Sequence, residues 1–336
     1  MLYDFISLAD LEAGDIYDLL ELAGSLKKMQ RESRVYHPLE GQSAVLVFEK
    51  PSLRTRVSFE VGMFQLGGQA IVLDQVHHRL GERESIADMA RNLERWVDGV
   101  VVRTYSHEAI VELAEHASVP VINALTDKQH PCQVIADAQA LSEHKGDFEG
   151  LKVVFAGDGN NVCASWMHFA ARIPIHFVLA CPEGYEASPE VLAFAQANAP
   201  GKVEVTHDLK AALAGADAVY TDVWASMGQE AEQADRARAF EPYQINAEAM
   251  ALAKPNAVFM HCLPAKRGSE VTDEVIDGPQ SIVYDQAENR LHSQKAIMVS
   301  LMERREDGLT AKRSHRGDVP QPAGRDEPRS GTNITA

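Results

Sequence analysis

The sequence has few cysteines, no long apolar run and no excess of positive charge. Its four cysteines form no CxxC pair and show no sign of a secreted context, so we expect reduced thiols in the cytoplasm. No apolar segment approaches the roughly 20 residues that a membrane-spanning helix needs. The first residues resemble neither a signal peptide nor an Arg-rich transit peptide. The net charge of −17 argues against non-specific nucleic-acid binding. With 45% apolar and 24% charged residues, we expect an ordinary soluble globular protein.

Short apolar runs alternate along the chain with stretches of helical periodicity, which indicates βαβ units and parallel sheets. A chain of 336 residues is also too long for one simple core. We therefore expect the α/β class, with two doubly wound parallel-sheet domains and a cleft between them. The predicted strands are 44–48, 71–73, 99–102 and 119–123 in the first series, and 151–156, 176–180, 202–205, 218–221, 257–260 and 281–284 in the second.

Two changes in composition set the expected domain boundaries. A long helical stretch ends in Lys-Gly-Asp at 145–147, which is typical of a hinge and separates a domain at 1–146 from one at 147–290. After Arg305 the chain consists of Gly, Pro, Ser, Thr and charged residues with almost no apolar content. We expect residues 306–336 to be a disordered tail, because they have little surface to bury.

The segment Ser52-Leu-Arg-Thr55 lies where the predicted strand 44–48 gives way to a helix. Pro51 breaks the strand and Ser52 is suited to be the N-cap of the helix. A helix N-terminus offers free backbone N–H groups and the positive end of the helix dipole. Because Arg54 and two hydroxyls lie beside them, the segment predicts a pocket for a phosphate-like dianion.

Polar residues follow several other predicted strands, at the edge where open α/β sheets bind their ligands. Singly, each is typical of a turn, but their repetition at strand ends in both halves is hard to explain as turn chemistry alone. Residues 157–161 resemble the start of a dinucleotide loop, although they lack its third glycine. The polar segments are Arg103, 129–133, 157–161, 222–228, 261–264 and 285–290.

Six of these motifs, in order, resemble the ornithine carbamoyltransferase family over about residues 1–305. The resemblance implies an N-terminal carbamoyl-phosphate domain, a C-terminal amino-acid domain, and terminal helices that cross between them, including a helix at about 291–305 that packs back on the first domain. It also implies trimers or multiples of trimers with shared active sites, and no cofactor or metal. The motifs are Ser52-Leu-Arg-Thr55, His130-Pro-Cys-Gln133, Gly157-Asp-Gly-Asn-Asn161, Asp222-Val-Trp-Ala-Ser-Met-Gly228, His261-Cys-Leu-Pro264 and Ala287-Glu-Asn-Arg290.

The resemblance implies three catalytic residues. Arg103 would reach both the phosphate and the carbonyl oxygen of carbamoyl phosphate, and His130 would donate a hydrogen bond to the oxygen of the tetrahedral intermediate. Cys262 would lie next to the reacting amine, without forming a covalent carbamoyl-enzyme. The implied carbamoyl-phosphate site is Ser52, Leu53 (through its backbone N–H), Arg54, Thr55, Arg79, Arg103, His130, Gln133, Cys262, Leu263 and Arg290.

The resemblance also implies an ornithine site in the second half of the chain. A carboxylate must bind the α-ammonium group, and Asp222 is the implied residue. Most of the rate gain would come from proximity and electrostatic stabilisation, with the departing phosphate as the final proton acceptor. The implied ornithine residues are Asn161, Asp222, Ser226 and Met227.

Two positions depart from the family pattern. Leu53 stands where the family usually has threonine, which matters little if the position contributes mainly a backbone N–H. Arg79 stands where the family commonly has a glutamine that reaches the neighbouring subunit's carbamoyl phosphate; arginine keeps the donors and adds charge. The adjacent His77 and His78 lack a carboxylate or thiol at ligand spacing, so we expect no metal there.

The predicted reaction transfers the carbamoyl group of carbamoyl phosphate to the δ-amine of L-ornithine, giving L-citrulline and phosphate in arginine metabolism. A putrescine carbamoyltransferase is an alternative, but it would not need Asn161 or the turn at 226–228. An N-acylated ornithine remains open as the substrate. A nucleotide-binding dehydrogenase would need an acidic residue after the strand 176–180, where Ala180-Cys-Pro182 offers none. A non-catalytic regulator on this fold would not need the complete polar set.

Overall fold

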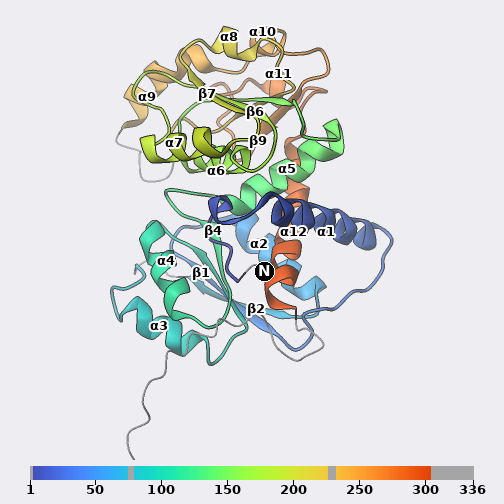
Figure 1. Ribbon diagram of the computed structural model, residues 1–336, viewed down its shortest axis with the longest axis vertical. Coiled ribbons are helices and arrows are strands. Elements are labelled where there is room, and N and C mark those ends of the chain that lie inside the picture. Colours follow the sequence, from blue (N-terminus) through green and yellow to red (C-terminus); the bar gives the residue numbers. More distant parts are fainter. Residues whose placement is uncertain (1–2, 75–78, 226–231, 304–336) are drawn as a thin grey trace, which may run out of the picture.

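In the computed structural model the chain forms two parallel β-sheets, one above the other, with helices around and between them (Figure 1). The structure describes residues 3–74, 79–225 and 232–303. Every strand pairs in parallel with its neighbour, so the predicted fold class is confirmed. The first sheet has the order β2-β1-β3-β4, with β1 Ser43–Phe48, β2 Gln69–Asp74, β3 Gly99–Arg103 and β4 Val121–Leu125.

The second sheet has the order β7-β6-β5-β8-β9 and lies in the upper part of Figure 1. In both sheets the central strands are short apolar runs buried on both faces, as parallel sheets covered by helices require. The strands of the second sheet are β5 Lys152–Ala156, β6 His176–Ala180, β7 Lys202–Thr206, β8 Ala218–Thr221 and β9 Val258–His261.

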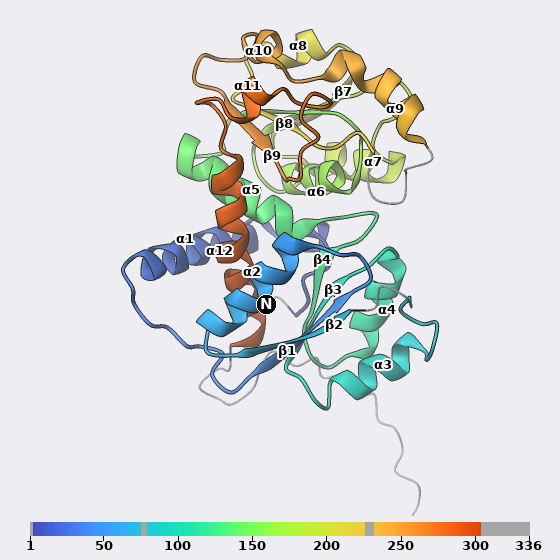
Figure 2. The ribbon, with the colours of Figure 1, turned by 180° about the vertical axis from the view of Figure 1, so that it is seen from behind.

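The helices cover the sheets, and the long helices α5 and α12 pass between the two halves (Figures 1 and 2). Many begin at a side chain that accepts a hydrogen bond from a backbone N–H of the first turn. No helix of the described chain is both long and apolar enough to cross a membrane. The helices are α1 Ala13–Arg31, α2 Leu53–Gln65, α3 Ile86–Leu93, α4 His107–His116, α5 Pro131–Lys145, α6 Asn161–Ala170, α7 Pro189–Asn198, α8 Leu209–Leu213, α9 Gln233–Phe240, α10 Ala247–Met250, α11 Asp273–Ile276 and α12 Val283–Met302, with 3₁₀ turns at Leu8–Asp10 and Glu241–Tyr243.

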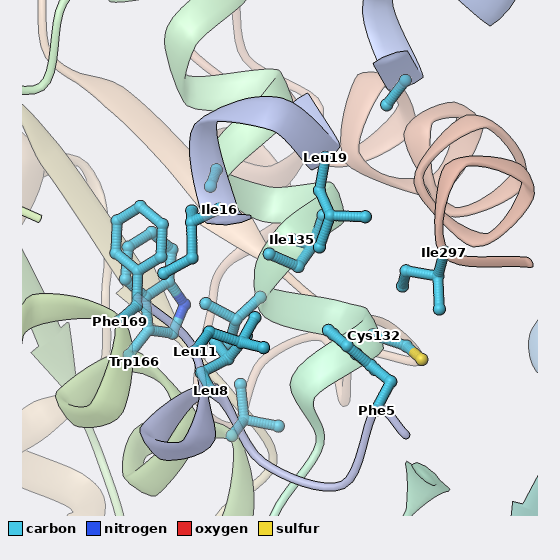
Figure 3. Close-up of a cluster of buried hydrophobic side chains, with 14 of the residues drawn as sticks. Phe5, Leu8, Leu11, Ile16, Leu19, Cys132, Ile135, Trp166, Phe169 and Ile297 are labelled. Atoms are coloured by element: carbon cyan, nitrogen blue, oxygen red, sulfur yellow. The ribbon is translucent and has the colours of Figure 1, made fainter. Parts of the chain in front are cut away.

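A hydrophobic cluster joins the two halves of the molecule. Side chains of the N-terminal segment and α1 pack there against α5, α6 and α12, so the core continues from one half to the other (Figure 3). Trp166 and Phe169 of α6 meet edge to face, with ring centroids 5.4 Å apart. The labelled members of the cluster are Phe5, Leu8, Leu11, Ile16, Leu19, Cys132, Ile135, Trp166, Phe169 and Ile297.

One predicted strand, at 281–284, is wrong. Ser281 makes only an isolated parallel bridge to Phe259, and the chain then turns into α12, which begins at Val283. A short apolar run fits a buried helix as well as a strand, and here helix packing decides. The helix expected at about 291–305 is therefore the later part of α12, and Arg290 lies inside a helix instead of after a strand.

Candidate active site

The carboxyl ends of strands from both sheets face a shared cavity of about 1180 Å³. Every described residue that the sequence analysis assigned to a substrate lines this cavity. Ser226 and Met227 lie outside the described residues, as do His77 and His78. The assigned residues at the cavity are Ser52, Leu53, Arg54, Thr55, Arg79, Arg103, His130, Gln133, Asn161, Asp222, Cys262, Leu263 and Arg290.

The N-terminus of α2 forms one wall. Ser52 is its N-cap: the Ser52 Oγ accepts a hydrogen bond from the Thr55 N–H at 3.2 Å and donates one to the Thr55 Oγ1 at 3.0 Å. Leu53, the first residue of the helix, is 76 % exposed, and its backbone N–H is one of the first-turn groups that have no partner within a helix. These groups and the positive end of the helix dipole face the cavity, where they favour an anion.

Three arginines converge beside that helix end. Arg290 reaches across from α12, donating from Nη1 to the Gln133 Oε1 at 2.6 Å and from Nη2 to the Thr55 Oγ1 at 3.2 Å. Burial and the nearby Arg290 and Arg54 lower the pKa of Arg103 to about 10. Among the described residues, none of the three guanidinium groups has a carboxylate partner, and the buried Arg103 Nε has no hydrogen bond. Such uncompensated positive charge suits an anionic ligand.

His130 lies at the start of α5, where its backbone N–H donates to the Ser165 Oγ at 2.8 Å. Burial, with the positive charges of Arg290, Arg103 and Arg54, lowers the pKa of its imidazole well below the usual 6.5. The ring is therefore neutral near pH 7 and has one N–H to donate. Its buried Nδ1 has no hydrogen-bond partner within the described chain.

The cavity thus has a positive pole, formed by the three arginines, and a negative pole, the carboxylate of Asp222, which follows β8. It accepts hydrogen bonds from the Asn160 Nδ2 at 2.8 Å, from the Val223 N–H at 2.8 Å and from the Cys262 Sγ at 3.1 Å. All three donors are uncharged, so the site keeps a net negative charge for a cationic group. The Asn161 Nδ2 donates instead to the Thr126 backbone oxygen at 2.7 Å, bridging the two halves.

Cys262 follows β9 and is a thiol in this environment. Burial, and the negative charge of Asp222 to which it donates, raise the pKa of Cys262 well above its usual value. A thiolate nucleophile is therefore disfavoured. The neighbouring Leu263 has φ +57°, and its N–H donates to the His261 Nδ1 at 2.8 Å. The Glu270 Oε1 lies 3.2 Å from the His261 Nε2, so the buried pair of His261 and Glu270 holds this turn in place.

The ligand atoms of Asp222, His261 and Cys262 lie within 4.8 Å of one another, an arrangement that could hold a metal ion. However, both nitrogens of His261 are already engaged, one by Leu263 and one by Glu270. The thiol is also protonated and donates to Asp222. A metal would have to displace all of these hydrogen bonds, so the donor set fits a hydrogen-bonded turn better than a metal centre.

Asn160 and Lys50 are two cavity residues to which the sequence analysis gave no role. Asn160 binds Asp222 and also caps α6. It lay within the motif 157–161, but the ornithine role there was assigned to its neighbour Asn161. Lys50 lies 4.1 Å from the centroid of the Tyr105 ring and forms an ion pair with Asp127. Arg79 lies over the same ring, 4.8 Å from its centroid, at the cavity of its own chain. Its reach into a neighbouring subunit stays a prediction.

Comparison with known proteins adds independent evidence. The family model described as "Aspartate/ornithine carbamoyltransferase, carbamoyl-P binding domain" matches residues 3–143, and the corresponding "Asp/Orn binding domain" model matches 149–301. The ornithine carbamoyltransferase of Chlorobaculum tepidum is 53% identical over 302 residues, covering 89% of each chain.

Solved structures agree with these matches. The structure of the Pyrococcus furiosus ornithine carbamoyltransferase is 48% identical with a TM-score of 0.87, covering 89% of this chain and 97% of that one. An N-acetyl-L-ornithine transcarbamylase structure is 35% identical with a TM-score of 0.80, covering 89% of this chain and all of that one (100%). With two family models spanning nearly all of its described length, this chain belongs to the aspartate/ornithine carbamoyltransferase family.

Proposed function

We propose that this protein is an enzyme that transfers the carbamoyl group of carbamoyl phosphate to the δ-amine of L-ornithine, giving L-citrulline and phosphate. One observation carries the proposal: a single cavity has an uncompensated cluster of arginines at one pole and a buried carboxylate at the other. Carbamoyl phosphate supplies the dianion and ornithine supplies the cation. Relatives at about half sequence identity are named for this reaction.

The pole at α2 is the proposed carbamoyl-phosphate site. The phosphate oxygens accept from the first-turn N–H groups, the two hydroxyls and the guanidinium groups. The carbonyl oxygen faces Arg103 and His130, where charge develops as the amine attacks. The neutral state of His130 supports a role as donor and not as proton acceptor. The proposed ligands of this pole are Ser52, Leu53, Arg54, Thr55, Arg79, Arg103, His130, Gln133, Cys262, Leu263 and Arg290.

The pole at Asp222 is the proposed amino-acid site. Its carboxylate binds the α-ammonium group of ornithine, and Asn161, Ser226 and Met227 bind the remaining amino-acid group; the last two lie outside the described residues. The side chain of ornithine then extends toward the carbamoyl carbon past Cys262. The protonated state of the thiol supports direct attack by the amine, with no covalent carbamoyl-enzyme.

In this mechanism the δ-ammonium group first gives one proton to solvent, and the neutral amine attacks the carbonyl carbon. A tetrahedral intermediate forms, in which the attacking nitrogen carries one more proton to lose. The C–O bond to phosphate then breaks, and the bonding electrons leave with the phosphate. Arg54, Arg103 and Arg290 stabilise the charge on that leaving group. The departing phosphate takes up the proton, so no side chain has to be regenerated as a base.

Several finer features belong to the same proposal. We propose domains at 1–146 and 147–290, with residues 291–305 packing back on the first domain and 306–336 forming a tail. We also propose a cytoplasmic enzyme of arginine biosynthesis that assembles as a homotrimer or a multiple of it. Support for assembly comes from the exposed apolar side chains of Val57, Ile71 and Leu73 on α2 and the edge strand β2, since such an edge invites a partner.

N-acylated ornithine is the second candidate acceptor, because one structural relative is named for N-acetylornithine. The test is citrulline formation by the purified protein from carbamoyl phosphate and ornithine, beside equal concentrations of N-acetylornithine and putrescine. We expect ornithine to exceed both by at least tenfold in kcat/KM. A preference for N-acetylornithine would mean that the acceptor is an N-acylated ornithine. No product with any of the three amines would refute carbamoyl transfer to this class of amine.

A further inference from the structure

Asp137 is a buried carboxylate on α5 that the mechanism above does not use. Its side chain is fully buried and accepts three hydrogen bonds. The Gln133 Nε2 and the Gln286 Nε2 donate to its Oδ1 at 2.7 Å and 2.8 Å, and the Tyr220 OH donates to its Oδ2 at 2.9 Å. These donors come from α5, α12 and β8, so one carboxylate ties both halves of the molecule together.

The carboxylate dictates the orientation of the Gln133 amide. An ionised carboxylate only accepts hydrogen bonds, so Gln133 must turn its NH₂ toward Asp137. Its Oε1 then faces the opposite way and accepts from the Arg290 Nη1 at 2.6 Å. If the amide were turned over, its NH₂ would face the guanidinium group of Arg290, and two donors would meet.

The same logic applies to Gln286 on the other side. Its Nε2 donates to Asp137, and its Oε1 therefore accepts from the backbone N–H of His261 at 3.0 Å. His261 begins the turn that carries Cys262 beside Asp222. One carboxylate thus orients two amides, of which one supports the arginine cluster and the other supports the amino-acid pole.

We propose that Asp137 is a positioning residue that holds the Gln133 amide oxygen toward Arg290 and the Gln286 amide oxygen toward the His261 turn, and so aligns the two substrate poles. This inference rests on the proposed function. Burial raises the pKa of Asp137 and the three hydrogen bonds partly offset it, so the pKa is raised to about 6 and the carboxylate is the prevailing form near pH 7.5. The hydrogen bonds retain an ionised group where burial alone would disfavour it.

Two substitutions at Asp137 separate positioning from charge. In Asp137→Asn the amide oxygen can keep both glutamine donors, while its NH₂ donates to the Tyr220 hydroxyl, which can also accept. We expect kcat/KM within about threefold of the wild type. Asp137→Leu cannot hold either amide, so we expect the Kd for carbamoyl phosphate to rise at least tenfold and kcat to fall by a similar factor.

Gln286→Leu provides a test through the other amide and leaves the Gln133 contact in place. We expect it to raise the KM for ornithine at least fivefold while the Kd for carbamoyl phosphate stays within threefold of the wild type. If Gln286 had a purely structural role, its replacement would change the KM for ornithine, the Kd for carbamoyl phosphate and the melting temperature together. If Asp137→Leu does not fold, Asp137→Asn and Gln286→Leu decide the matter.

The proposal is overturned if Asp137→Leu binds carbamoyl phosphate like the wild type, if Asp137→Asn loses as much as Asp137→Leu, or if Gln286→Leu weakens both substrates equally. Carbamoyl-phosphate binding is measured by calorimetry, and turnover by citrulline formation. If the wild type formed no citrulline, the proposed function would fail, whereas the calorimetric comparison would still test the role of Asp137.

Discussion

Replacing Asp222 by asparagine removes the negative charge of the amino-acid pole while keeping its size. The carboxylate accepts from three uncharged donors, so its charge is free to pair with the α-ammonium group of ornithine. Loss of a charged hydrogen bond costs about 1.5–3 kcal/mol. Since about 1.4 kcal/mol corresponds to a factor of ten, we expect kcat/KM for ornithine to fall about 10- to 150-fold.

The structure also predicts which kinetic parameter changes. The arginine cluster is not bonded to Asp222, so the KM for carbamoyl phosphate should change less than threefold. Residual activity on putrescine should fall by a similar factor, because putrescine lacks only the α-carboxylate and its second ammonium group takes the place of the α-ammonium group of ornithine. The assay is initial-rate citrulline or carbamoylputrescine formation, with each substrate varied while the other is saturating.

Asp217→Asn is a matched control for this substitution. Asp217 precedes the same strand, β8, at its opposite end, where both carboxylate oxygens lie 2.8 Å from the Lys254 Nζ. Its replacement should lower the melting temperature without changing the KM for ornithine. A fall in kcat with an unchanged KM for ornithine in Asp222→Asn would refute our reasoning and move Asp222 to the reacting end of the substrate.

Three further predictions follow from other parts of the molecule. Arg54→Ala removes a charge-assisted contact to phosphate and should lower carbamoyl-phosphate turnover by several orders of magnitude; a variant within about tenfold of the wild type would place the phosphate elsewhere. Truncation after Gly308 should leave activity and melting temperature nearly unchanged, because the apolar content falls sharply after Arg305; a loss of several degrees would contradict this. Burial lowers the pKa of His168 and of His292 to about 4, so the unfolded chain takes up protons first as the pH falls below about 6.5. The contribution of these histidines to the free energy of unfolding should be fully present above pH 6.5 and should decrease by about 2 kcal/mol per histidine by pH 5, measured by urea unfolding. An unchanged dependence of the unfolding free energy on pH in His168→Gln would contradict that assignment.

The sequence was most informative where local chemistry determines structure. Ser52 caps α2 as predicted, because a serine after a proline-ended strand has few better uses for its hydroxyl. The apolar runs of the buried strands likewise predicted both parallel sheets. The run at 281–284 was misassigned because so short a run, Ser-Ile-Val-Tyr, cannot by itself distinguish a strand from a buried helix.

The remaining parts of the site depend on contacts between distant residues. Asn160 and Asn161 are neighbours of the same type, yet only Asn160 binds Asp222, and no periodicity could distinguish them. Asp137 is one acidic residue on a long helix, where a solvated carboxylate is the usual expectation. Its importance emerges only when α12 and β8 bring donors to it. Tertiary packing supplies this information, and local sequence does not contain it.

The most direct test of the account is a crystal structure with a stable analogue in which a phosphonate is joined through a carbonyl group to the δ-nitrogen of ornithine. We predict that the phosphonate lies at the N-terminus of α2 between Arg54 and Arg103, and that the α-ammonium group contacts Asp222. A single molecule would then connect both poles of the cavity. A phosphonate bound at the Asp222 pole, or an amino-acid group bound outside this cavity, would contradict the account.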